Sequence, residues 1–295
     1  MSTPPPLARL GRRLDRGATR RSLVLLLPLG LLEALVFAVP LGYLLRLSLY
    51  GRTDSGAFDT GTVSLDGYAY LVTSPVVANV AVFTAWFATV VTVLAVVVGL
   101  VYGYAIWRAD GVVRLTLLAG VVVSLLTTLV VKLFAVVLVF SPAGTLNAVL
   151  PTTGLLETPL PPVNNAVGPV IAQLYVVVPY AVLAVHSVLD GLDDQLIEAA
   201  RDLGAGRLTA FKAIVVPHAL PGVAVAAGVS FAWSVGAYAA PLLVGSGGER
   251  TAGVHVSALL LQRYDWPAAA ALAVVTVVAV AASLGAVLVA VRRRD

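Results

Sequence analysis

Residues 198–217 read EAARDLGAGRLTAFKAIVVP and lie between two long apolar segments. The stretch is polar and helix-prone. Four apolar residues just before and within it fall at helical spacing on one face, namely Leu196, Ala199, Ala200 and Leu203. Gly204 follows this face, and glycine ends helices because it accepts a positive φ at little cost. We therefore expect two short helices with a break over residues 190–217, and an apolar segment that resumes near Pro217.

The composition of the whole chain indicates the environment in which it folds. Of the 295 residues, 59% are hydrophobic and 12% are charged, whereas soluble domains carry about 25% charged residues. Mean hydropathy is +0.96. A water-soluble fold cannot hide this much apolar surface, so the chain is expected to lie in a lipid membrane.

Several kinds of chemistry find no support in the residues. The chain has no cysteine, and its three histidines, His186, His218 and His255, are too far apart to predict a metal site. It has no P-loop, no nucleophile elbow and no H-E-x-x-H motif. We therefore expect no enzyme activity, no metal and no cofactor bound by this chain itself.

Apolar segments long enough to cross a bilayer define the predicted fold. A membrane helix needs about 20 apolar residues, and six segments qualify, roughly 23–45, 78–106, 115–140, 168–189, 219–244 and 267–291. The sequence thus predicts an all-α membrane protein with six transmembrane helices. Residues 1–21 are expected to form a basic tail, and residues 22–295 one transmembrane domain that includes the loop at about 190–217. A further short helix is expected over Val254–Arg263.

Lysine and arginine predict the orientation. These residues are concentrated in the tail, in the loop between the second and third helices, in the 190–217 loop and at the C-terminus. The positive-inside rule places all four regions, and therefore both termini, in the cytoplasm. The net charge of +4 is then explained by anchoring to anionic headgroups, and nucleic-acid binding is not expected.

The polar stretch carries a family resemblance. Its spacing E-A-A-x3-G-x9-I-x-x-P is similar to the cytoplasmic signature of the membrane subunits of ATP-binding-cassette (ABC) importers. The resemblance implies a type I importer permease that docks an ATPase through seven residues: Glu198, Ala199, Ala200, Asp202, Gly204, Ile214 and Pro217. An ordinary amphipathic loop at the membrane interface is the alternative that composition alone would favour.

The same resemblance implies an assembly. Two permease subunits, identical or different, would form one pathway in the cell membrane of a prokaryote. Two ABC ATPase subunits, which hold ATP and Mg²⁺, would dock on the cytoplasmic loops, and an extracytoplasmic solute-binding protein would deliver a small solute.

Short motifs place the chain near the spermidine/putrescine-type branch of these permeases. Among them are Val178-Pro179-Tyr180, Pro221-Gly222 and Asp265-Trp266-Pro267. The branch implies a polyamine-like substrate. One departure speaks against it, because this chain has Ala237 where polyamine-type relatives often carry an acid.

Four residues are candidates for the substrate pathway: Glu33, Lys132, Trp233 and Tyr238. Charged groups inside a membrane are costly, and they usually face a bundle interior or water. Glu33 and Lys132 could pair with each other, and each could instead have a purely structural role, as could the two aromatic residues. Intramembrane charges also occur in secondary transporters driven by an ion gradient. Such a transporter is the alternative function, although it would leave the signature loop unexplained.

Overall fold

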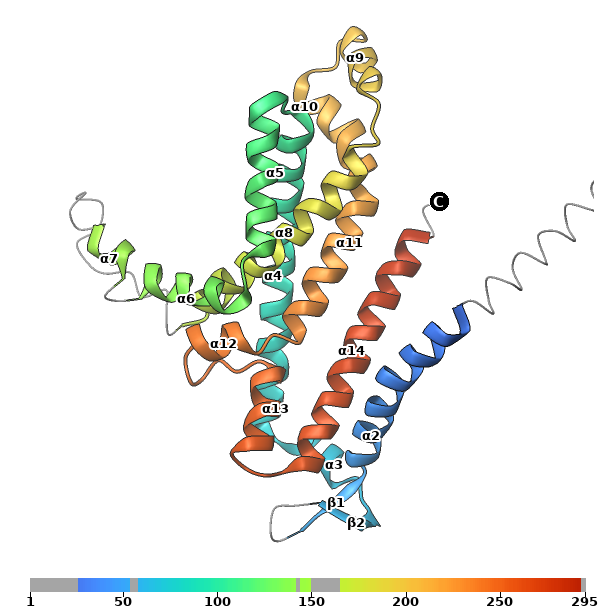
Figure 1. The fold of residues 1–295 in the computed structure, drawn as a ribbon, viewed down its shortest axis with the longest axis vertical. Helices are drawn as coiled ribbons and strands as arrows, with labels where there is room; N and C mark the ends of the chain where they lie inside the picture. The colour runs from blue at the N-terminus through green and yellow to red at the C-terminus, as the bar shows by residue number, and fades with distance from the viewer. Residues whose placement is uncertain (1–25, 54–57, 142–143, 150–164, 293–295) are drawn as a thin grey trace, which may run out of the picture.

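The computed structural model describes residues 26–53, 58–141, 144–149 and 165–292, and within them the protein is almost entirely helical (Figure 1). The helices are α2 (Val39–Leu47), α3 (Asp66–Thr73), α4 (Pro75–Arg108), α5 (Gly111–Leu126), α6 (Leu129–Phe140), α7 (Thr145–Val149), α8 (Val167–Leu189), α9 (Asp194–Asp202), α10 (Arg207–Ala210), α11 (Val216–Val235), α12 (Ala239–Val244), α13 (Ala252–Leu261) and α14 (Trp266–Arg292). Two π-helical turns, Ala34–Ala38 and Phe211–Val215, precede α2 and α11. The basic tail predicted for residues 1–21 lies outside the described residues.

Helices α4, α8 and α11 form the centre of the bundle. Small residues let their backbones approach closely, as is common between membrane helices. A Cβ atom added to Gly99 of α4 would lie 3.0 Å from Ala181 of α8, and one added to Gly222 of α11 would lie 2.6 Å from the Ala184 carbonyl oxygen. The main apolar cluster of buried residues fills the space between these three helices.

Six described helical segments are long and apolar enough to span a membrane, which agrees with the predicted number. They are Leu26–Leu47, Pro75–Arg108, Leu129–Val149, Val167–Leu189, Arg207–Val235 and Trp266–Val287. The one that starts at Leu129 takes in α6 and α7 and runs across residues that the structure does not describe.

The third predicted span, 115–140, is wrong as one continuous helix. The chain breaks at Thr127 and Thr128, both of which have an extended backbone. The Thr127 N–H and hydroxyl both donate to the Val123 carbonyl, so the last turn of α5 is satisfied up to the break. Beyond the break, α6 leaves the line of α5 and runs crosswise away from the bundle (Figure 1).

The fifth predicted span, 219–244, is also interrupted. Helix α11 ends at Val235, and α12 begins only at Ala239. The carbonyl oxygen of Ala237 in the break accepts a hydrogen bond from the Thr251 hydroxyl at 2.7 Å. Thr251 directly precedes α13. Helix α13, Ala252–Leu261, is the short helix that the sequence predicts near Val254–Arg263.

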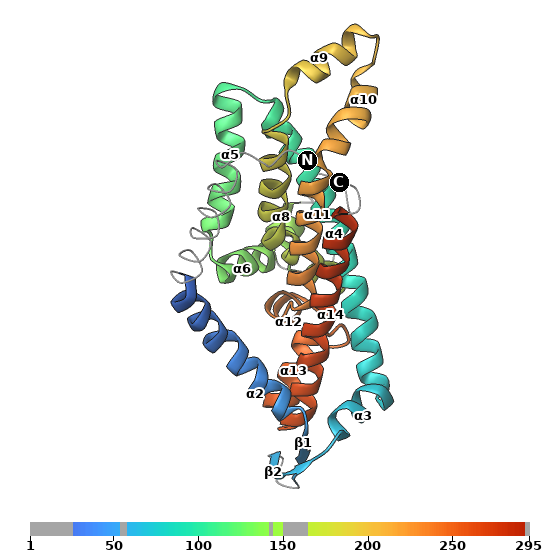
Figure 2. The same cartoon turned by 90° about the vertical axis from the view of Figure 1, so that its right-hand side faces the viewer.

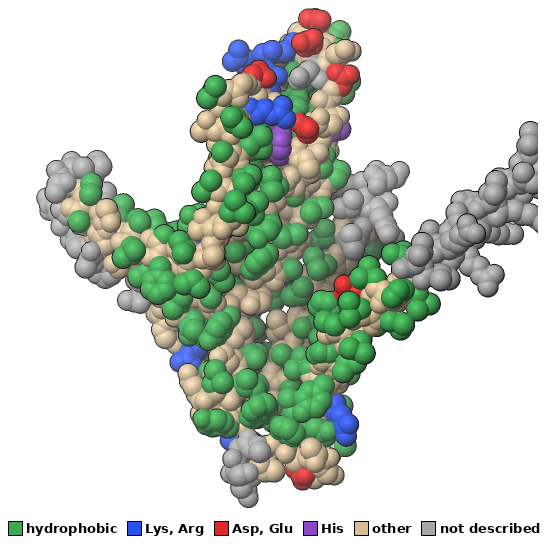
Figure 3. Space-filling model, viewed as in Figure 1, with side chains coloured by type: hydrophobic (Ala, Val, Ile, Leu, Met, Phe, Trp, Pro, Cys, Tyr) green, Lys and Arg blue, Asp and Glu red, His purple; other side chains and the backbone are tan. Residues whose placement is uncertain are grey.

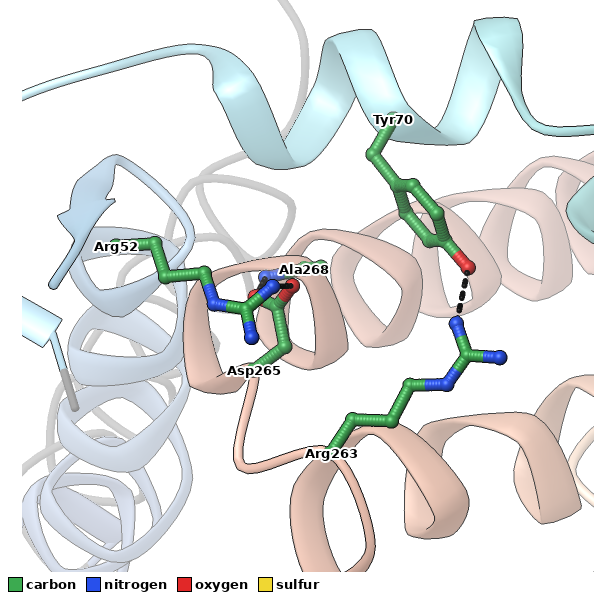
Figure 4. A network of polar contacts seen from close by, with 5 residues as sticks. All are labelled: Arg52, Tyr70, Arg263, Asp265 and Ala268. Atoms are coloured by element: carbon green, nitrogen blue, oxygen red, sulfur yellow. Dashed lines mark hydrogen bonds and ion pairs between the residues drawn. The ribbon is translucent and has the colours of Figure 1, made fainter. Parts of the chain in front are cut away.

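The end of the bundle opposite α9 holds a small polar network. Strands β1 (Tyr50–Arg52) and β2 (Phe58–Val63) pair antiparallel, with Arg52 opposite Phe58. Arg52 reaches across to Asp265, at 3.1 Å, and Asp265 also accepts from the Ala268 N–H in the first turn of α14, as Figure 4 shows. The two views place these strands and α3 at one end of the molecule, and α9, α10 and the start of α5 at the other (Figures 1 and 2).

Candidate functional site

Helix α9 has a specific cap at each end. At its start, the Asp193 carboxylate accepts a hydrogen bond from the Gln195 N–H at 3.0 Å, which satisfies a donor that the helix leaves free. At its end, Gly204 takes a φ of +88°. The Gly204 N–H donates to the Arg201 carbonyl and the Ala205 N–H to the Ala200 carbonyl, the pair of bonds of a Schellman motif. The predicted helix and its glycine stop are therefore present.

The faces of α9 differ from the simplest expectation. Ile197 is the residue that attaches this helix to the bundle, because it is buried and joins the main apolar cluster with Ala210 and Val215. Leu196 and Leu203 are instead 54% and 89% exposed. Ala199 is exposed as well, and Ala200 is half-buried. Most of the predicted apolar face therefore points away from the chain's own core.

Two acidic residues of α9, Glu198 and Asp202, are exposed as well. Within the described part of the chain, Glu198 forms no ion pair with Arg201, although their spacing permits one. Arg201 instead lines a cavity of about 330 Å³ beneath α9, together with Arg108 and Arg207. Figure 3 shows basic and acidic side chains gathered at this end of the molecule, above a body on which hydrophobic side chains predominate.

The remaining docking candidates lie where the loop joins the membrane helix. Helix α10, the π-helical turn Phe211–Val215 and α11 follow one another without a break. Ile214 lies half-buried in the π-helical turn, and Pro217 lies exposed just after that turn, at the beginning of α11. Phe211 packs edge-on against Tyr104 of α4, with ring centroids 5.0 Å apart. Nothing in the amino-acid pattern singles out Tyr104 or Ile197.

The pathway candidates do not form one cluster. Lys132 is buried in α6, and its ammonium lies over the ring of Tyr175 in α8, 5.4 Å from the centroid. Trp233 in α11 packs against Tyr180 of α8 at 5.1 Å. The Tyr238 hydroxyl lies 3.5 Å from Ser257 Oγ. Tyr175 was not expected, because nothing in the sequence marks one aromatic residue of an apolar helix above another.

Glu33 lies apart from the other three. It is exposed, in a first helix that buries none of its most apolar window. Figure 1 places α2 and α6 on opposite sides of the central helices. The pairing of Glu33 with Lys132, which the sequence left open, is therefore not formed.

Comparison with known proteins identifies the class of the chain. Residues 95–294 match the family described as binding-protein-dependent transport system inner membrane component. The spermidine/putrescine permease PotB of Escherichia coli is 27% identical over 218 residues, 74% of this chain and 79% of that protein. A probable molybdenum ABC transporter permease of Haloferax volcanii is 31% identical over 238 residues, which cover 79% of each chain.

A solved structure supports the same fold. The chain superimposes on a bacterial ABC transporter involved in alginate import with a TM-score of 0.74, at 15% identity, over 97% of this chain and 99% of that one. A second alginate transporter structure, which contains a periplasmic protein with bound alginate, gives a TM-score of 0.70. Fold and family agree, and the chain belongs to the inner-membrane permease components of binding-protein-dependent ABC importers.

Proposed function

We propose that this permease couples ATP hydrolysis on a partner subunit to transport through the exposed face of α9. The observation that carries the proposal is the stripe of Leu196, Ala199 and Leu203, which lies in solvent although it is apolar. Exposed apolar patches of this kind mark interaction sites. Glu198 lies beside the stripe and has no partner of its own in the described chain, so it is available to a basic residue of the ATPase.

The packing around α9 suggests how motion would be transmitted. Ile197 and the aromatic pair Phe211 and Tyr104 connect the docking helix to α4 and α11. A displacement of α9 by the ATPase would therefore move the cytoplasmic ends of two central helices. Coupling requires that α9 make different contacts in the ATP-bound and ATP-free states, because only a difference in binding free energy shifts a conformational equilibrium.

The other parts of the assembly complete the proposal. The α9 end and both termini face the cytoplasm, a second permease subunit of the same or another sequence completes the pathway, and a solute-binding protein delivers substrate at the opposite end. The relatives include one named for polyamines and one named for molybdenum. A polyamine and an oxyanion are therefore both candidate substrates. The family match favours this importer over a transporter driven by an ion gradient.

Affinity purification of the tagged chain from its host in mild detergent tests the docking. An ABC ATPase should be recovered with the wild-type chain, and recovery should fall at least tenfold for Glu198→Arg. Asp66→Arg is the matched control, because Asp66 is an exposed acid at the opposite end of the bundle. Equal ATPase recovery with Glu198→Arg and Asp66→Arg, or no ATPase with the wild type after crosslinking, would refute the proposal.

A further inference from the structure

Lys132 is a basic residue buried within a membrane-spanning segment, which is an unusual place for a charge. Its residue is only 4% exposed, and it lies in the helical segment Leu129–Val149, which is apolar enough to span the membrane. Among the residues that the structure describes, no ion pair or hydrogen bond reaches the Lys132 ammonium, which lies over the face of the Tyr175 ring. Such a cation–π contact offsets only part of the cost of burying an ammonium in a membrane interior.

The membrane-spanning segments offer no negative charge to compensate. Across the six described segments, the sequence contains a single carboxylate, Glu33. Glu33 is exposed on the first helix, on the other side of the central helices from α6. Within the described membrane-spanning segments, the electrostatic field along α6 and α8 is therefore that of one uncompensated positive charge. A polycation moving past it would be repelled, and an anion would be attracted.

Tyr175, which contacts Lys132, also lines a cavity that contains a group suited to an anion. Tyr175 is partly exposed and lines a cavity of about 260 Å³ between α4, α5 and α8. Ser124, on another wall of the same cavity, has a buried hydroxyl without a hydrogen-bond partner among the described residues. A hydroxyl can donate to an anion, so a substrate that binds here would give this group a partner.

We propose that the substrate of this permease is a small anion of the oxyanion or carboxylate class, and that Lys132 meets its negative charge in the membrane. The proposal rests on the importer function argued above and selects between its candidate substrates. Lys132 then supplies the counter-charge for the anion. Its burial lowers the stability of the fold, but its positive charge lowers the energy barrier to the passage of anions.

Uptake measurements in the host test this substrate class. Cells without the chromosomal copy of the chain, carrying the wild type or a variant, are given labelled sulfate, molybdate, phosphate or citrate, and in parallel spermidine or putrescine. We expect ATP-dependent uptake of at least one anion. Lys132→Met should lower it at least tenfold, while Lys132→Arg, which keeps the charge, should retain most of it.

The outcomes separate the two proposals. Uptake of only the polyamines, uptake of none of the four anions, or anion uptake unchanged by Lys132→Met would overturn the anion assignment. Copurification of the ATPase with Lys132→Met checks that the variant is folded and assembled. Failure of the importer itself would be recognised differently, as the absence of an ATPase from the wild-type preparation.

Discussion

Helices α8 and α9 follow each other in the chain, yet they are held in opposite ways. Helix α8 packs between α4 and α11 so closely that Gly99 and Gly222 bring backbones into contact. Helix α9 is attached through Ile197 and leaves Leu196 and Leu203 in solvent. Much of α8 is buried within this chain, whereas most of α9 is exposed. Under the docking proposal, the difference separates residues that maintain the fold from residues that can contact a partner.

The largest expected effect is on the closely packed contact between α8 and α11. In Gly222→Ala, the new methyl group would meet the Ala184 carbonyl oxygen at 2.6 Å and the Val185 Cα at 3.0 Å. Both are backbone atoms, so α11 must move away from α8, at a cost of about 1–3 kcal/mol. We expect a lower thermal unfolding midpoint and a lower yield in detergent.

Gly285→Ala in α14 is the control for this substitution, because no atom lies within 4 Å of its added methyl group. It should be neutral or slightly stabilising, since alanine favours helices. Equal destabilisation by the two alanines would mean that close backbone approach does not limit the packing of α11 on α8.

Two substitutions at neighbouring positions of α9 test how this exposed helix is attached and what its exposed face does. Ile197→Ser removes the buried attachment and should destabilise the docking loop by roughly 2 kcal/mol or more. Leu196→Ser alters an exposed position and should change stability by less than about 0.5 kcal/mol. Recovery of the ATPase should nevertheless fall severalfold for Leu196→Ser. Thermal unfolding and copurification, measured on the same preparations, distinguish the two roles, and unchanged ATPase recovery with Leu196→Ser would argue against the exposed face.

The two regions also differ in how well the sequence predicts them. The number of membrane helices, the capped helix α9 and its glycine stop follow from local rules, since apolar length, an Asp cap and a glycine act over a few residues. Which face of α9 turns inward does not follow. Ile197 and Leu196 are equally apolar, and their burial depends on the ends of α4 and α11, which lie far away in sequence.

The breaks in the third and fifth spans were missed for a related reason. The apolar segment continues through Thr127 and Thr128, so hydropathy alone predicts one continuous helix. The interruption appears instead in the extended backbone of these two threonines, which hydropathy does not report. Similarly, the gap after Val235 is stabilised by Thr251 from a later segment. Tyr175 was unpredictable as the neighbour of Lys132 because the contact depends on the direction that α6 takes after its break.

The glycine that ends α9 gives a prediction of intermediate size. Gly204 has a φ of +88°, a conformation that costs an alanine about 1 kcal/mol. Gly204→Ala should therefore increase the rate of amide hydrogen exchange in the last turn of α9 by about fivefold. Gly248→Ala should not, because Gly248 has open space and no positive φ. Unchanged exchange in both variants would show that this cap does not limit the stability of α9.

His255 in helix α13 leads to a prediction of how the stability of the protein depends on pH. Burial lowers the pKa of His255 below its usual value of 6.5, and the positive charges of Arg263 and Arg250 lower it further. Below pH 6.5 the unfolded chain then binds a proton that the folded chain does not, so stability is full above this pH and decreases as pH falls. The unfolding midpoint should show this decrease in wild type and in His218→Ala, and less of it in His255→Leu. An identical pH profile for all three proteins would exclude His255 as the cause.

The smallest expected effect concerns the ion pair that joins α5 to the beginning of the docking loop. Arg114 and Asp190 lie 2.8 Å apart, but their side chains are 41% and 56% exposed. Such pairs contribute about 0–1 kcal/mol, and salt weakens them. A double-mutant cycle with Arg114→Ala and Asp190→Ala should give a coupling free energy below about 0.5 kcal/mol. A larger value would mean that the loop is fixed electrostatically at α5 as well as through Ile197, and α9 would then be less free to move than its exposed surface indicates.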